Sequence, residues 1–183
     1  MTISHSLGRF FRSWLFLPVL ALLVWGGIQW YKTPDQKAQT AAADFTGYLA
    51  NGDSLRLSDF RGQWVVLNFW GSWCGPCRQH NRHLVDLYQR YWQASFDGAK
   101  GLTIISAGME TNRDRWLQAI EKDGLSWPHH ISDLNRLQDH VAKRYGVREI
   151  PATFLIDPQG QVVVVNPQPD ELDALLAAQV QAQ

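Results

Sequence analysis

The 183-residue sequence predicts an α/β fold in which a mixed central sheet is flanked by helices. Three observations support this prediction. Residues 63–70 form an apolar run rich in β-branched and aromatic side chains, which is typical of a buried strand. Residues 75–91 follow at once and carry apolar side chains at helical spacing. Strand-like and helix-like segments then continue to alternate towards the C-terminus.

The first elements of the domain are short. Residues 44–49 and 54–57 are expected to be two strands of an N-terminal β-hairpin around the turn Asn51-Gly52-Asp53. Residues 102–107 are apolar and predict a second buried strand. Residues 111–122 predict an inserted helix, because a polar capping segment precedes apolar side chains at helical spacing.

The last elements are predicted by the same patterns. One helix is expected to end at Gly146, and its stripe is Leu134, Leu137, Val141 and Tyr145. Residues 153–156 and 162–165 predict a β-hairpin, since a turn of the type Asp-Pro-Gln-Gly separates them. A final helix is expected from about Asp170, with the stripe Leu172, Leu175, Leu176 and Val180. After the N-terminal hairpin the predicted order is β-α-β-α-α-β-β-α.

The N-terminal part differs in character from the rest. Residues 13–31 carry no charge and predict one transmembrane helix, because at ~1.5 Å per residue they nearly match a ~30 Å hydrocarbon core. Residues 1–12 would be a short cytoplasmic tail, residues 32–42 a polar linker and residues 43–183 the folded domain. The alternative is a cleaved signal peptide, although the small residues 41–43 lie well past the apolar run.

Charge argues against nucleic-acid binding. The chain has 17 basic and 17 acidic residues, a formal net charge of zero, and shows no basic stripe. The flanking charges of the apolar segment do not fix its orientation, because two basic residues lie on each side of it.

The only two cysteines stand in Trp73-Cys74-Gly75-Pro76-Cys77, between the strand and the helix. A pair at this spacing can close a disulfide and reopen it. The attacking species is a thiolate, and a helix N-terminus favours negative charge. Cys74 is therefore expected to be the nucleophile and Cys77, one turn further in, the resolving thiol. Trp73 is expected to cover the edge of the disulfide.

Other uses of two cysteines fit less well. A zinc site needs four ligands, and neither His80 and His83 nor His129-His130 completes such a set. A c-type haem site needs a histidine directly after the second cysteine, where this chain has Arg78. A purely structural disulfide remains an alternative. No metal and no cofactor is expected.

Two motifs together resemble a known family. Residues 65–77 (VVLNFWGSWCGPC) and residues 146–157 (GVREIPATFLID) look like the thioredoxin superfamily, and more narrowly the membrane-anchored TlpA/ResA-type thiol–disulfide oxidoreductases. The resemblance covers about residues 43–166. It implies a thioredoxin fold in which Pro151 is cis and faces the cysteines, and in which Ile150, Pro151 and Ala152 position an extended segment of the partner. Trp73, Gly75 and Pro76 would contribute to the same binding surface.

The resemblance also implies a function. It predicts a single-pass protein of the bacterial inner membrane whose domain, monomeric in itself, faces the periplasm and reduces disulfides of secreted proteins, for example apocytochrome c in cytochrome c maturation. Electrons would come from a membrane thiol transporter of the CcdA or DsbD kind. Gly75-Pro76 is the thioredoxin dipeptide, which favours a reductase. A disulfide oxidase or isomerase of the same fold and a non-enzymatic copper-delivery protein remain alternatives.

Two further residues are candidates by position. Glu110 follows the strand at 102–107, and in this family an acid near the cysteines could move protons if burial raises its pKa; the alternative is a solvated carboxylate. Asn68 stands where thioredoxins usually carry an aspartate and cannot titrate, so a hydrogen-bonded core amide is the expected role. Asn81-Arg82 departs from the family, which often has an apolar residue and a proline there.

Overall fold

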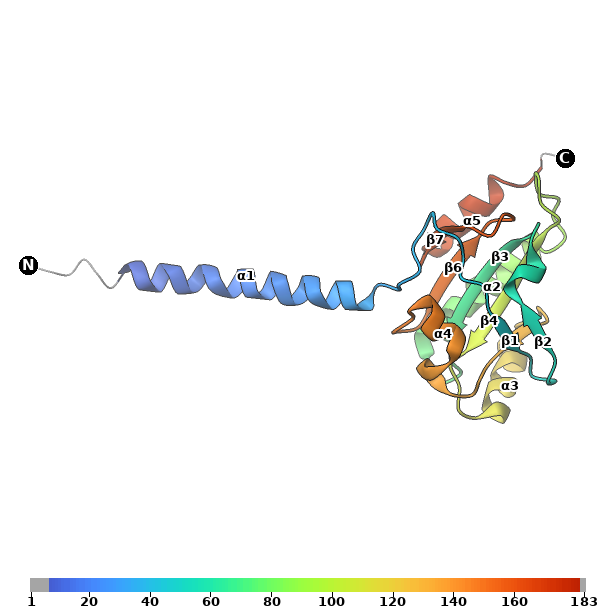
Figure 1. Ribbon diagram of the computed structural model, residues 1–183, viewed down its shortest axis with the longest axis horizontal. Coiled ribbons are helices and arrows are strands. Elements are labelled where there is room, and N and C mark those ends of the chain that lie inside the picture. The colour runs from blue at the N-terminus through green and yellow to red at the C-terminus, as the bar shows by residue number, and fades with distance from the viewer. Residues whose placement is uncertain (1–6, 182–183) are drawn as a thin grey trace, which may run out of the picture. The chain divides into compact units, whose positions relative to one another are not determined.

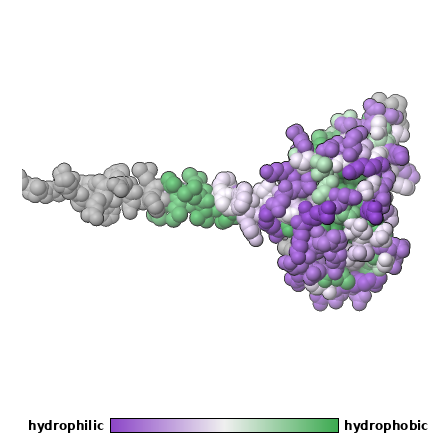
Figure 2. Space-filling model, in the orientation of Figure 1, coloured by the Kyte–Doolittle hydropathy of each residue, from purple (hydrophilic) through white to green (hydrophobic). Residues whose placement is uncertain are grey.

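The computed structural model describes residues 7–181 and divides the chain into two units, one ending at Thr33 and the other running from Pro34 to the C-terminus. The first unit contains α1, Leu7–Lys32. Large apolar side chains of its described part are exposed, and they form a green stretch in Figure 2. Within the described residues, no helix has both the length and the apolar character required to cross a membrane.

The second unit is built around a five-stranded sheet in the order β5-β4-β3-β6-β7. Figure 1 labels all of these strands except β5. The strands are β3 (Trp64–Trp70), β4 (Leu102–Gly108), β5 (His129–Ile131), β6 (Ala152–Ile156) and β7 (Val162–Val165). β3, β4 and β5 are parallel, whereas β6 and β7 run antiparallel to their neighbours. Every residue of β3, β4 and β6 is buried, as expected for strands covered on both faces.

Three helices cover one face of the sheet. α2 (Gly75–Tyr91), α3 (Arg113–Lys122) and α5 (Pro169–Ala177) pack their apolar stripes on the side chains of alternate strand residues. The members of this core include Val66, Trp70, Ile104, Leu84, Leu87, Trp116, Leu172 and Leu176. Both cysteines belong to it, so the redox motif is anchored in a packed core.

The other face carries a smaller helix and the N-terminal hairpin. α4 (His140–Tyr145) and the strands β1 (Thr46–Tyr48) and β2 (Ser54–Arg56) lie here, and a 3₁₀ turn, Leu57–Phe60, follows β2. This core includes Phe45, Leu57, Leu67, Phe69, Ile105, Val141, Tyr145 and Phe154. Tyr145 contacts Phe45, Phe69 and Phe154 through ring pairs with centroids 5.0–6.0 Å apart.

Most of the sequence-based elements are confirmed: the N-terminal hairpin, the strands at 63–70 and 102–107, the inserted helix, the C-terminal hairpin and the last helix. The final helix ends at Ala177, so Val180 lies beyond it. Three elements were missed, namely the 3₁₀ turns at Leu57–Phe60 and Arg136–Gln138 and the strand β5. The observed order after the hairpin therefore has a strand between the second and third helices.

The helix predicted from Leu134 is wrong in its first half. Leu134 and Arg136 have φ of 56° and 50°, values that a right-handed helix cannot accommodate. α4 begins only at His140, where the carboxylate of Asp139 accepts the N–H groups of Val141 and Ala142. Gly146 ends the helix at φ 65°, as expected.

Candidate active site

The topology brings three sequence motifs to one edge of the sheet. β3 and β4 are parallel, and their last residues, Trp70 and Gly108, are register partners. β6 is antiparallel to β3 and begins beside Phe69 with Ala152. The cysteine motif follows β3, Glu110 follows β4 and Pro151 precedes β6. All three therefore lie at this edge, although Cys74 and Pro151 are 77 positions apart in the sequence.

Cys74 and Cys77 form a disulfide with their Cα atoms 5.2 Å apart. Cys74 is the N-cap of α2, and its Sγ accepts the backbone N–H of Cys77 at 3.2 Å. This N–H and the helix N-terminus stabilise negative charge on Cys74 once the disulfide is reduced. Cys74 retains 7% of its surface and Cys77 none, which supports the predicted roles of nucleophile and resolving thiol. Pro76 lies in the first turn of α2, where its missing N–H has no partner to lose.

The loop before β6 faces the outer sulfur. The peptide bond between Ile150 and Pro151 is cis, as the resemblance implies. The carbonyl oxygen of Ile150 lies 4.0 Å from Cys74 Sγ. Ile150 and Pro151 are partly exposed, whereas the side chain of Ala152 is buried in the core. Of the three residues predicted to position a partner, Ala152 can therefore contribute only its backbone.

Trp73 lies beside the disulfide and is held from two sides. Its indole N–H donates to the carbonyl of Met109 at 2.8 Å. The guanidinium carbon of Arg136 lies 5.6 Å from the centre of its ring, within the range of a cation–π contact. The ring remains 54% exposed, so it offers a fixed apolar surface next to Cys74. Arg136 was missed by the sequence analysis, because nothing in its neighbourhood marks it out.

Glu110 is buried and binds the segment that leads into the cysteine motif. Its carboxylate accepts the backbone N–H of Ser72 and, at 3.0 Å, the hydroxyl of the same residue. Burial raises the pKa of Glu110, and the Ser72 hydrogen bonds and the charge of Arg136 only partly oppose this. The expectation of a buried acid with a raised pKa is confirmed. None of its hydrogen bonds within residues 7–181 reaches a sulfur, and its contact with the cysteine motif is through Ser72.

A chain of hydrogen bonds connects α2 with β3 and β6. Asn68 donates to Asn81 at 2.9 Å and accepts the hydroxyl of Thr153 at 3.2 Å. That hydroxyl is 3.0 Å from His80 Nε2 and, since its proton goes to Asn68, it accepts from the imidazole. Burial, aided by the charge of His83, lowers the pKa of His80. Asn68 is thus a hydrogen-bonded core amide, as expected, and Asn81 buries its side chain where the family often has an apolar residue.

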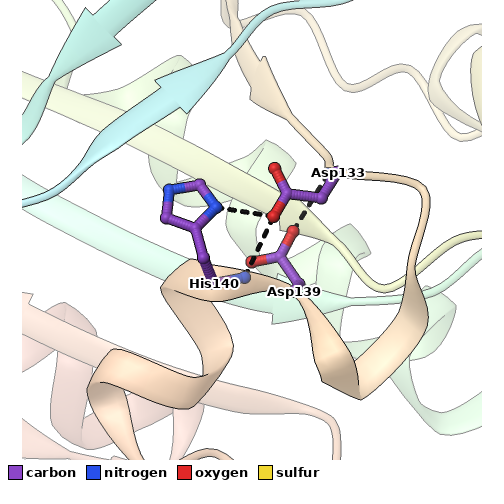
Figure 3. A group of neighbouring side chains, drawn as sticks. All are labelled: Asp133, Asp139 and His140. Atoms are coloured by element: carbon purple, nitrogen blue, oxygen red, sulfur yellow. Dashed lines mark hydrogen bonds and ion pairs between the residues drawn. The ribbon is translucent and has the colours of Figure 1, made fainter.

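One further group of polar side chains merits a test as a metal site. Asp133, Asp139 and His140 are the only such cluster in the described part of the chain, and their potential ligand atoms lie within 4.8 Å of one another (Figure 3). These atoms already have partners. His140 contacts Asp133 Oδ2 at 2.5 Å and the Thr46 carbonyl at 2.6 Å, and Asp139 caps α4. The cluster therefore joins the hairpin to α4.

The paired histidines are explained by packing. The ring of His130 stacks on Trp127, and its Nε2 lies 3.2 Å from the carbonyl of Leu125. Burial lowers the pKa of His130 to about 4, so it is a neutral core residue at physiological pH. The ring of His129 contacts Phe60 edge-on with centroids 4.8 Å apart.

Disulfide exchange requires a sulfur that can ionise, a second sulfur within reach of it and an open surface where the partner chain can approach. All three occur at this edge of the sheet, which defines the class as thioredoxin-like thiol–disulfide oxidoreductases. The model of the AhpC/TSA family matches residues 38–165, and the chain belongs to that family.

Individual relatives agree with this class. The chain is 33% identical over 148 residues to the thiol-disulfide oxidoreductase ResA of Geobacillus thermodenitrificans, an alignment that covers 81% of this chain and 79% of the relative. The ResA of Halalkalibacterium halodurans is 31% identical, with 85% and 86% covered. A thiol-disulfide oxidoreductase from Bacteroides fragilis superposes with a TM-score of 0.68 at 29% identity, covering 76% of this chain and 98% of that structure. The thioredoxin domain of a thiol-disulfide oxidoreductase from Bacteroides vulgatus also gives 0.68, at 26% identity, with 79% and 98% covered.

Proposed function

We propose that this chain is a reductase of protein disulfides that acts outside the cytoplasm. The observation that carries the proposal is the Cys74–Cys77 disulfide at the start of α2, facing the loop that contains cis-Pro151. In the reduced protein, the Cys74 thiolate attacks one sulfur of a partner disulfide and the other partner sulfur leaves as a thiolate. The Cys77 thiolate then attacks Cys74, which releases the second partner thiolate and restores the intramolecular disulfide. Two electrons pass from the dithiol to the partner.

The proposed direction of electron transfer, from this protein to its partner, rests on the residues between the cysteines. Gly75-Pro76 is the thioredoxin dipeptide, and thioredoxin has a potential of about −270 mV against about −120 mV for DsbA. The protein would be reduced again by a dithiol donor, for which a membrane thiol transporter of the CcdA or DsbD kind is suited. Apocytochrome c and other secreted proteins with disulfides are the proposed substrates. A potential above about −150 mV would instead favour an oxidase or isomerase.

The proposed location rests on the N-terminal unit. Residues 13–31 are uncharged, and the described apolar side chains of α1 are exposed, with Leu22 and Leu23 at 66% and 68% and Trp25 at 63%. Exposed apolar surface of this extent requires a cover, and a bilayer provides one. Although the described part of α1 does not by itself meet the requirements of a membrane span, we propose that residues 13–31 anchor the chain, and the resemblance of its motifs to the TlpA/ResA type favours a domain in the periplasm. In intact cells, a membrane-impermeant maleimide should label reduced Cys74; labelling only after lysis would contradict this location.

Trapping of the partner tests the proposed reaction. A Cys77→Ser variant of the full chain cannot resolve the mixed disulfide, so it should accumulate covalent complexes through Cys74 that dissolve in dithiothreitol. The Cys74→Ser variant is the matched control and should capture no partner. Complexes formed by Cys74→Ser and not by Cys77→Ser would reverse the two roles, and their absence from both variants would refute the reductase proposal.

A further inference from the structure

A second surface feature adjoins the cysteine motif. A cavity of about 300 Å³ lies between the segment that precedes Cys74 and the helix α3. Its lining residues are Ser72, Trp73, Arg78, Arg115, Gln118, Ala119 and Lys122. Trp73 belongs both to this cavity and to the exposed surface beside the disulfide, so a chain bound at Cys74 can continue into the cavity. We refer to these seven residues as the α3 groove.

The charge of the α3 groove is one-sided. Three of its lining residues are basic and none is acidic. Arg78 is neutralised by Asp123, to which its Nε and Nη2 donate at 2.8 and 2.5 Å. Arg115 and Lys122 are exposed on α3, and neither forms an ion pair with a residue that the structure describes. Two positive charges are thus left for an incoming chain, although the whole chain has a net charge of zero.

A third cation contacts Trp73 from a different segment of the chain. The guanidinium of Arg136 sits over the Trp73 ring and comes from the loop after β5, whereas Arg115 and Lys122 come from α3. Two carboxylates adjoin this surface: Asp123 is paired with Arg78, and Glu110 is buried and accepts hydrogen bonds from Ser72. A partner that approaches Cys74 therefore meets an exposed indole together with positive charge from two segments of the chain.

We propose that the α3 groove selects partners with acidic residues beside the reacting disulfide. The occupant is an extended polypeptide segment whose cysteine reacts at Cys74, whose apolar residue packs on Trp73 and whose carboxylate faces Arg115 and Lys122. The proposal rests on the reductase function above and names its substrate class. Exposed ion pairs contribute little to affinity but discriminate between partners and steer their approach. The selection should therefore be visible in kcat/KM at low salt.

Matched peptides test the selection with the full-length protein. Three peptides share one intramolecular disulfide and carry Glu, Gln or Lys at the three positions on each side of it. At low salt, the Glu peptide should be reduced with a kcat/KM roughly fivefold above that of the Lys peptide, the size expected for one or two exposed ion pairs. The preference should disappear in about 1 M salt, where the screening length falls to about 3 Å.

Variants that replace the basic residues with uncharged ones test whether the preference for the Glu peptide comes from the α3 groove. Arg115→Gln/Lys122→Gln should bring the ratio between the Glu and Lys peptides close to one, because it removes the two charges that attract the first peptide and repel the second. The control is Lys100→Gln/Lys143→Gln, which removes the same charge from exposed positions outside the groove. Lys100 precedes the first residue of β4, at the end of that strand away from the cysteine motif. This control should keep the wild-type ratio.

The outcomes separate the two proposals. Equal rates for the three peptides, or a ratio that falls as far in the control as in the groove variant, would overturn the selection and leave the reductase function intact. A wild-type protein that reduces none of the peptides while a thioredoxin reduces all of them would refute the reductase function, and the selection with it.

Discussion

Gly71 separates the central strand from the cysteine motif, and the structure predicts that even alanine is too large there. A Cβ at Gly71 would lie 2.8 Å from Trp73 Nε1, 2.9 Å from Trp73 Cε2 and 3.3 Å from Ile150 Cδ1. The first two distances are well inside van der Waals contact. Gly71→Ala therefore forces the indole or the cis-proline loop to move away from its position beside Cys74.

The cost can be bounded from the contacts that must change. Overpacking by one methyl group costs about 1–3 kcal/mol. Displacing the indole also breaks its 2.8 Å hydrogen bond to the Met109 carbonyl, worth about 0.5–1.5 kcal/mol. Gly71→Ala should thus lower the free energy of unfolding by about 2–4 kcal/mol. Gly75→Ala is the matched control on the other side of Cys74, because nothing lies within 4 Å of its Cβ, and it should be neutral or slightly stabilising.

Urea unfolding of the oxidised protein measures these differences, and the indole N–H resonance of Trp73 reports whether the ring has moved. Trp73→Phe removes the atoms that the added methyl group would meet, so the two substitutions should cost less together than the sum of their separate effects. A Gly71→Ala protein with wild-type stability and an unshifted Trp73 resonance would refute the reasoning, as would a strictly additive double mutant.

Three other predictions follow from buried or paired polar groups. Burial raises the pKa of Glu110, so its contribution to stability is complete below its ordinary pKa of 4.5 and is lost as the pH rises through its pKa in the folded protein. Glu110→Gln should remove this decline from urea midpoints measured between pH 4 and 8. The control Glu121→Gln, at an exposed site, should keep the decline. Thr153→Val leaves Asn68 without one hydrogen bond in the core and should cost about 1–3 kcal/mol of unfolding free energy, while Thr153→Ser keeps the hydroxyl and most of the stability. Burial lowers the pKa of His140, but its hydrogen bonds to Asp133 and Thr46 and the charge of Asp133 outweigh burial and raise the pKa above 6.5 (Figure 3). Stability should therefore fall as the pH rises through the pKa of His140 in the folded protein. His140→Gln should flatten that part of the plot of stability against pH, and an unchanged slope would contradict the assignment.

Sequence patterns were sufficient to predict the elements whose structure is determined by one physical cause. The central strand β3 is buried on both faces, so its run of apolar residues leaves no alternative to a core strand. The cysteine motif combines a strand end, a helix start and two sulfurs within a few residues, and its geometry is local. The cis bond at Pro151 came from the resemblance and not from the residues themselves.

Sequence patterns did not predict the structure correctly where it depends on backbone dihedral angles or on contacts between residues far apart in the sequence. The stripe Leu134, Leu137, Val141 and Tyr145 has helical spacing, yet positive φ values at Leu134 and Arg136 and the cap at Asp139 confine the helix to its second half. β5 has three residues, too few to show alternation. The contacts of Arg136 with Trp73 and of His80 with Thr153 join residues 63 and 73 positions apart, and only the folded chain reveals them.

The residues that surround the cysteines come almost entirely from loops at one edge of the sheet. The segments after β3 and β4, the loop that carries Arg136 and the segment before β6 contribute to this surface without forming rungs of the five-stranded sheet. Substitutions of the exposed residues among them, such as Trp73 and Arg136, leave both cores and the strand register untouched. During evolution, the same scaffold can therefore acquire new client proteins by exchanging loop residues such as those around Trp73, while the chemistry of the two sulfurs is inherited unchanged.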